Sequence, residues 1–157
     1  ARVIFADISP EALSVTRKNI SLHRLNSRCV ALEADALSPP PLRMQDFDLI
    51  ACNPPYISEE ELAKLDASVS EWEPMLALDG GEDGLVFYRS VLRNWKSVLK
   101  DGGWIIFEIG EGQAEAVRRL LLKAGFHNLG CTLDTLGTER VIYAQKKKHH
   151  STESEEM

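Results

Sequence analysis

The sequence predicts an α/β protein of the doubly wound class, in which a mostly parallel sheet carries helices on both faces. Short apolar runs alternate with helix-like stretches, and they lie at Arg2–Ala6, Cys29–Glu33, Phe47–Cys52, Trp104–Ile109 and Val141–Ala144. The earlier runs are almost continuously apolar, as expected for strands that are buried on both faces. The length of 157 residues and the hydrophobic content of 44% are sufficient for a single core. We therefore expect one domain over residues 1–145, followed by a disordered charged tail over residues 146–157.

The first strand is followed by a clear helix start. Ser9 can accept hydrogen bonds from the free N–H groups at the beginning of a helix, and Pro10 suits the first helical position. The apolar residues that follow recur at helical spacing, so they predict a helix that runs to about Leu22.

Two more helices and a closing pair of strands are predicted in the second half. The stretch from Tyr88 to Leu99 has apolar residues at helical spacing, and we expect it to end at the Asp101-Gly102-Gly103 turn. The stretch from Ala114 to Ala124 has the same spacing and stops at Gly125. From Phe126 onward the pattern predicts two antiparallel strands with a turn between them.

Composition and charge exclude several classes of protein. No apolar run approaches the roughly 20 residues that cross a bilayer, and no export signal is visible, so we expect a soluble, cytoplasmic protein. The cysteines, Cys29, Cys52 and Cys131, are odd in number and far apart, which argues against a disulfide framework and a zinc site. The formal charge of -6 gives no general attraction to nucleic-acid phosphates and favours a protein or small-molecule substrate.

Polar residues end the first three predicted strands, where open α/β sheets bind their ligands. Asp7 ends the first strand, Asp35 the second and Asn53 the third. A carboxylate at the Asp7 position can accept hydrogen bonds from both hydroxyls of a ribose, and capping of the following helix explains it equally well. For Asp35 the candidate partner is the amino group of an adenine.

The segment Asn53-Pro54-Pro55-Tyr56 is the most specific feature of the sequence. Its prolines enforce extended backbone and cannot donate hydrogen bonds, so the carbonyl groups there are left free. The side-chain oxygen of Asn53 and a neighbouring carbonyl can hold both hydrogens of a planar NH₂ group, with the ring of Tyr56 against the same plane. A simple turn, or a ligand for an aromatic-lined groove, is the alternative. The position directly after a buried strand favours the amide or amine clamp.

Together these segments resemble the release factor glutamine methyltransferase family (PrmC/HemK), which are class I S-adenosylmethionine-dependent enzymes. The tetrapeptide is shared with DNA adenine and RNA guanine methyltransferases and indicates only the reaction type. The segment Leu78–Gly84 favours the glutamine branch. The similar residues are Asp7–Leu13, Asp48–Ile50, Asn53–Ile57, Glu73-Pro74, Ala77–Leu85, Glu108–Gly110, Gln113, Asp134, Gly137 and Arg140.

The resemblance implies a Rossmann-like fold with an antiparallel last strand, and methyl transfer from S-adenosylmethionine to the glutamine amide nitrogen of the Gly-Gly-Gln loop in peptide-chain release factors. It assigns catalysis to Asn53, Pro54 and Tyr56, and no catalytic metal is needed. The implied substrate contacts are Asn53, Pro54, Pro55, Tyr56 and Glu73. The implied cofactor contacts are Asp7, Ile8, Asp35, Ala36 and Asn53.

Three further segments have structural explanations beside the functional ones. Glu73 either lines the substrate pocket or is an exposed loop carboxylate. The stretch Asp79–Gly84 is expected to form a turn that braces the pocket, because its glycines supply unusual backbone angles. Asp134 and Arg140 are expected to form a structural pair between the last strands.

One departure from the family concerns the beginning of the domain. The family places a strand and a glycine-rich loop ahead of the first strand found here, and a small helical domain before them. We therefore expect an N-terminally truncated domain with the first strand missing. Two other hypotheses stay open: a nucleic-acid amine methyltransferase, which the acidic charge and the Asp79–Gly84 segment count against, and a non-catalytic remnant that holds a partner's loop.

Overall fold

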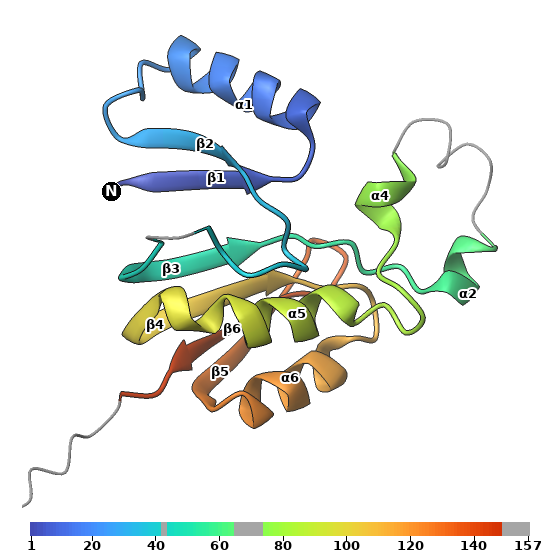
Figure 1. Ribbon diagram of the computed structural model, residues 1–157. Coiled ribbons are helices and arrows are strands. Elements are labelled where there is room, and N and C mark those ends of the chain that lie inside the picture. The colour runs from blue at the N-terminus through green and yellow to red at the C-terminus, as the bar shows by residue number, and fades with distance from the viewer. Residues whose placement is uncertain (42–43, 65–73, 149–157) are drawn as a thin grey trace, which may run out of the picture. The chain divides into compact units, whose positions relative to one another are not determined.

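The computed structural model describes residues 1–41, 44–64 and 74–148 (Figure 1). The chain divides into two compact units, Ala1–Met44 and Gln45–Met157.

The first unit is a β-α-β motif. It contains β1 (Val3–Asp7), α1 (Pro10–Leu22) and β2 (Cys29–Glu33), and the two strands pair in parallel. The side chain of Ser9 accepts a hydrogen bond from the backbone N–H of Ala12 at 3.1 Å, and Pro10 opens the helix. Both ends of the predicted helix are therefore confirmed.

β1 is more exposed than its apolar sequence predicts. All five of its residues are exposed, and the exposed fraction of Phe5 is 43%. The physical reason is that β1 belongs to a sheet of two strands with one helix, which supplies too few layers to bury both faces. Burial in this unit is concentrated under α1, at Leu13 and Ile20. The prediction that the early strands are buried on both faces is wrong for β1, and it is also wrong for the strand Phe47–Cys52, none of whose residues is buried.

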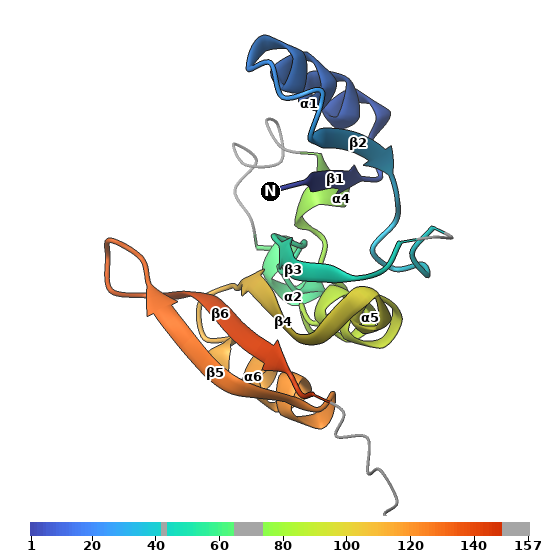
Figure 2. The ribbon, with the colours of Figure 1, turned by 90° about the vertical axis from the view of Figure 1, so that its left-hand side faces the viewer.

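The second unit is built on a four-stranded sheet in the order β3-β4-β6-β5 (Figures 1 and 2). β3 (Phe47–Cys52) pairs in parallel with β4 (Leu99–Glu108). β6 (Glu139–Lys146) pairs antiparallel with both β4 and β5 (Phe126–Leu133). The predicted closing pair of antiparallel strands is confirmed, and β6 extends one residue into the expected tail.

Helices α5 (Val86–Asn94) and α6 (Ala114–Lys123) contact each other and lie against the same side of this sheet (Figures 1 and 2). α6 ends before Gly125, whose φ of +84° fits the predicted stop. Three short elements complete the unit: α2 (Glu59–Leu62), α4 (Met75–Leu78) and the 3-10 helix η1 (Lys96–Val98).

The second helix does not end where the sequence predicted, at the Asp101-Gly102-Gly103 turn. α5 stops at Asn94, and the Asp101-Gly102-Gly103 segment lies inside β4. The strand is irregular there, because its register against β3 shifts between Phe47 and Leu49 and Gly102 has a φ of +79°. The glycines therefore permit a distortion of the strand instead of ending a helix.

The core of the second unit lies between its sheet and the two long helices. Tyr88 of α5 packs edge-on against Phe107 of β4, with ring centroids 5.2 Å apart and an interplanar angle of 86°. The other large, fully buried side chains here are Leu99, Ile105, Ile109, Val117, Leu121, Phe126 and Ile142. This core fixes the end of β4 and the start of α6, from which the residues of the candidate site extend.

All three cysteines are free thiols, and Cys29 is buried. Among the helices of the described residues, none is both long enough and apolar enough to cross a membrane.

The cap of α1 can be tested with a matched pair of serine substitutions. Ser9→Ala removes the acceptor for the Ala12 N–H and should lower the opening free energy of α1 by about 1 kcal/mol. Ser14→Ala changes an exposed serine within the same helix and should alter that free energy by less than about 0.5 kcal/mol. Native-state hydrogen exchange of the α1 amides measures both values, and equal effects would contradict the capping role.

Candidate functional site

The segment Asn53-Pro54-Pro55-Tyr56 leaves the carboxyl end of β3 as an irregular loop. Asn53 is exposed, Pro54 is buried, and Pro55 and Tyr56 are half-buried. Among the contacts of residues 1–41, 44–64 and 74–148, no hydrogen bond uses the Asn53 side chain or the carbonyl of either proline. The loop therefore presents free acceptors, which agrees with the expectation from its prolines.

The backbone of Tyr56 is enclosed by glycines. A Cβ atom on Gly80 would lie 2.8 Å from the carbonyl carbon of Tyr56, and one on Gly84 would lie 2.4 Å from its carbonyl oxygen. A Cβ atom on Gly110 would lie 3.0 Å from Cδ2 of the Tyr56 ring. The approaches at Gly80 and Gly84 are so close that only glycine allows them, and the approach at Gly110 is tight. We call Gly80, Gly84, Gly110 and Gln113 the Tyr56 cradle.

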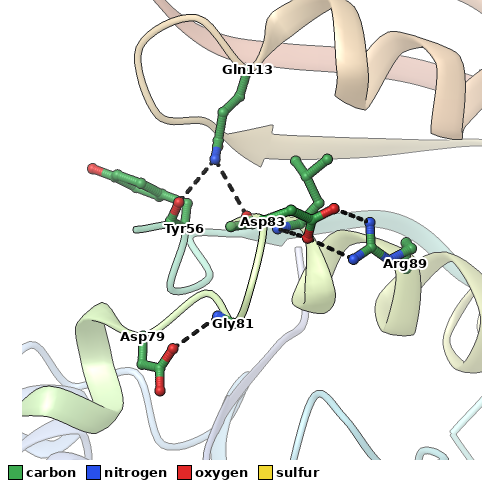
Figure 3. Close-up of polar contacts among 8 residues, drawn as sticks. Tyr56, Asp79, Gly81, Asp83, Arg89 and Gln113 are labelled. Carbon is green, nitrogen blue, oxygen red and sulfur yellow. Dashed lines mark hydrogen bonds and ion pairs between the residues drawn. The ribbon is translucent and has the colours of Figure 1, made fainter. Parts of the chain in front are cut away.

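Gln113 closes the cradle from the start of α6 (Figure 3). Its Nε2 donates to the carbonyl oxygen of Tyr56 at 2.9 Å and to that of Gly84 at 3.4 Å. Its Oε1 accepts from the backbone N–H of Gly110 at 3.0 Å. These partners fix the orientation of the amide, because carbonyl oxygens can only accept and a backbone N–H can only donate.

Tyr88 supports the cradle from the core. Its hydroxyl donates to the carbonyl of Glu108 at 2.9 Å and lies 3.3 Å from Oε1 of Gln113. Burial raises the pKa of the Tyr88 phenol well above its usual value, so the group stays a neutral donor. The Tyr88 hydroxyl therefore connects the end of β4, through Glu108, with the start of α6, through Gln113.

The predicted turn at Asp79–Gly84 is confirmed (Figure 3). Asp79 accepts from the N–H of Gly81 at 2.8 Å, and Gly81 and Gly84 have φ values of +80° and +69°. Arg89 of α5 donates to both oxygens of Asp83, at 2.9 and 2.7 Å. The hydrogen bond from Arg89 holds the pKa of Asp83 below its usual value, so the pair is charged at neutral pH.

Backbone bonds join this turn to the loop after β3. Ile57 and Asp79 form a parallel bridge, in which the Ile57 N–H donates to Leu78 at 3.1 Å and the Gly80 N–H donates to Ile57 at 2.8 Å. Backbone hydrogen bonds therefore connect the turn and the loop directly beside Tyr56.

Asp7 is the last residue of β1, and Asp35 follows shortly after the end of β2 at Glu33. Because the two strands are adjacent and parallel, both carboxylates lie at the same edge of the sheet of the first unit. Asp7 is exposed, and its Oδ1 accepts at 2.8 Å from the N–H of Ser9, the residue before α1, while the cap of the helix is Ser9 itself. The Oδ2 of Asp7 has no partner among the described residues. Both oxygens of Asp35 accept local bonds, from Leu37 and Ser38, each at 2.8 Å.

The structure says less about the other predicted contacts, which are Ile8 and Ala36 for the cofactor and Glu73 for the substrate. The side chain of Ile8 is 46% exposed, and Ala36 is half-buried. The roles of Asp7, Ile8, Asp35 and Ala36 at a cofactor stay predictions. Glu73 lies outside the described residues.

Two other polar groups near the site are structural. The side chain of Asp134 caps the turn between β5 and β6 and pairs with Arg140 at 3.2 Å, which confirms the predicted pair. Arg140 also donates to the carbonyl of Ile109 at 3.2 Å, next to the cradle.

Burial raises the pKa of the Cys52 thiol to about 12, so this neighbour of Asn53 is not a thiolate nucleophile at neutral pH.

Sequence reasoning did not assign roles to Gln113, Tyr88 or the Asp83–Arg89 pair. One signal was available for Gln113, since a glutamine placed between Gly112 and an apolar helix is a poor helix cap and needs another use. Tyr88 has the spacing of an ordinary core residue, and the contact of its hydroxyl cannot be deduced from spacing.

No protein-family model matches the sequence. The chain is 41% identical to the release factor glutamine methyltransferase of Clostridium botulinum, over 92% of this chain and 51% of that protein. It is 41% identical to the one of Clostridium acetobutylicum, over 90% of this chain and 50% of that protein. The chain therefore spans about half the length of these curated relatives.

Among solved structures, the chain resembles a methyltransferase from Pyrococcus furiosus with a TM-score of 0.65. The sequences are 17% identical, and the match covers 93% of this chain and 63% of that one. At this identity the likeness concerns the fold alone, and it agrees with the predicted class I methyltransferase architecture.

The cradle can be tested with two alanine substitutions at glycines of positive φ. Gly84→Ala places a methyl group 2.4 Å from the Tyr56 carbonyl oxygen and 2.6 Å from Nε2 of Gln113. It should lower the free energy of unfolding by about 3 to 5 kcal/mol. Gly137→Ala has a φ of +84° but open space around it, so about 1 kcal/mol is expected. Urea denaturation measures both, and similar losses would contradict the close approach.

Proposed function

We propose that the chain carries the amide-binding part of a protein-(glutamine-N5) methyltransferase, because it belongs to the release factor glutamine methyltransferase family. It spans about half the length of the relatives that it matches. The substrate is the glutamine of the Gly-Gly-Gln loop in peptide-chain release factors, and the methyl donor is S-adenosylmethionine. Direct binding to nucleic acid is not part of this function.

The free acceptors after β3 are the observation that carries the proposal. The Asn53 side chain and the carbonyls of Pro54 and Pro55 have no partners among the described residues, whereas the carbonyl of Tyr56 is held inside the cradle. Free acceptors on a rigid loop suit a ligand with two hydrogens on one planar nitrogen. A glutamine side-chain amide has this character.

The residues of the loop act by binding and orientation. The oxygen of Asn53 and the carbonyl of Pro54 accept the two N–H groups of the substrate, and the Tyr56 ring lies beside the same plane. An amide nitrogen is a weak nucleophile, and acceptors directed at its hydrogens favour the positive charge that develops during attack. S-adenosylmethionine, when bound, supplies an electrophilic methyl group. Fixed orientation of the nitrogen lowers the entropic barrier by roughly several kcal/mol.

The first unit has residues that fit the donor. Asp7 is exposed and keeps Oδ2 available as an acceptor for ribose hydroxyls. Asp35 is engaged in its own turn, yet each carboxylate oxygen has a second lone pair that can accept from an adenine amino group. Ile8 and Ala36 adjoin these carboxylates and would supply apolar and backbone contacts. The chemistry of these groups is consistent with an adenosine, and their roles are part of the proposal.

The proposal can be tested by following labelled methyl groups. The chain is incubated with labelled S-adenosylmethionine and a release factor, beside a chimera in which it replaces the matching half of the Clostridium botulinum relative. We expect label on the glutamine of the Gly-Gly-Gln loop, at least with the chimera. Label on adenine or guanine of nucleic acid would instead favour the amine methyltransferase. Cofactor and release-factor binding without any transfer would favour the non-catalytic remnant.

Asn53→Ala separates substrate binding from cofactor binding. It removes one acceptor of the amide and should lower turnover in the chimera by about a hundredfold or more, while the affinity for S-adenosylmethionine stays within about twofold. Asn19→Ala, at an exposed position on α1, is the matched control and should leave both values unchanged. Turnover and calorimetric titration measure the two quantities. A loss of cofactor affinity in Asn53→Ala would contradict the substrate role.

A further inference from the structure

Gln113 occupies an unusual position for its residue type. It is the residue before α6, where a side chain commonly caps the helix, yet its side chain makes no capping hydrogen bond. It extends instead across the end of β4 toward the loop that follows β3 (Figure 3). The start of α6 therefore has no side-chain cap, and the side-chain amide of Gln113 binds the loop after β3 instead.

The amide of Gln113 is fully engaged. Both hydrogens of Nε2 are directed at carbonyl oxygens, of Tyr56 and Gly84, and Oε1 faces the Gly110 N–H and the Tyr88 hydroxyl. No other side-chain donor reaches the Tyr56 carbonyl among the described residues. One half-buried side chain thus joins three segments that are far apart in the sequence.

The two prolines make this anchor effective. Cys52 is fixed in β3 opposite Phe107 of β4, and Tyr56 is fixed by the cradle. Only three residues separate these points, and Pro54 and Pro55 among them have φ fixed by their rings. Holding both ends therefore leaves the intervening carbonyls little freedom to turn.

We propose that Gln113 is the positioning residue of the amide-binding loop. By holding the Tyr56 carbonyl inside the cradle, it leaves the Pro54 carbonyl and the Asn53 side chain as the acceptors that face a substrate. The identity of the substrate rests on the proposed function, whereas the positioning of the loop does not.

Two substitutions remove the hydrogen-bond donors of Gln113, and only the first of them keeps its acceptor. Gln113→Glu keeps the shape and an oxygen for the Gly110 N–H, but it turns a carboxylate oxygen toward two carbonyls. Gln113→Met keeps a similar length and removes all four polar contacts. The matched control is Gln145→Met, because Nε2 of Gln145 donates to the carbonyl of Gly102 at 2.9 Å, remote from the loop in the sequence and in its contacts.

The first readout is hydrogen exchange in the full chain. Both Gln113 variants should speed exchange of the Ile57 and Gly80 amides by at least about tenfold, while the core amides of Ile105 and Ile142 stay protected. Gln145→Met should leave the Ile57 and Gly80 amides unchanged. Unchanged exchange in both Gln113 variants, or equal acceleration in the control, would overturn the positioning role.

The second readout is the affinity for a peptide that contains Gly-Gly-Gln, measured by calorimetry. Both Gln113 variants should weaken binding by about tenfold to a hundredfold, because a displaced acceptor no longer meets the amide, and the control should bind like the unmodified chain. Faster loop exchange in the variants, with no peptide binding by the unmodified chain, would uphold Gln113 as the anchor and overturn the proposed substrate. Full peptide affinity in both variants would overturn the role assigned to Gln113.

Discussion

The hydrogen bond from Gln113 to the Tyr56 carbonyl determines how the end of β3 is presented. It can form only because Gly84 and Gly80 bring their backbones against Tyr56 without side-chain atoms in between. The same amide accepts from the Gly110 N–H, which ties the contact to the end of β4. A single polar side chain and three glycines therefore define a backbone arrangement that apolar packing alone would not fix.

This arrangement separates support from binding. The turn that contains Asp79 and Gly81 and the pair formed by Asp83 and Arg89 supply rigidity, and their polar groups are engaged with each other. The acceptors of the loop, in contrast, have no partners among the described residues. Sites that recognise one planar group with high directionality require such a division, because an acceptor that moves by about 1 Å loses most of its advantage.

The sequence predicted most elements of the fold from local physical signals. Ser9 and Pro10 located the start of α1, and Gly125 located the end of α6. The signals failed where the same residue type has two uses. Gly102 and Gly103 distort a strand and do not end a helix, and β1 is apolar yet exposed within its unit. At the site, the prolines predicted free carbonyls, whereas the contact of Gln113 with Tyr56, 57 residues away, depends on tertiary geometry that no local pattern contains.

The carbon-13 signals of the backbone carbonyls test the central claim most directly. If the Pro54 carbonyl accepts from the substrate amide while the Tyr56 carbonyl stays bound to Gln113, titration with a Gly-Gly-Gln peptide should shift the Pro54 carbonyl signal saturably. The Tyr56 carbonyl signal should remain in place. A saturable shift at Tyr56, or a bound peptide that leaves the Pro54 signal unchanged, would contradict the account.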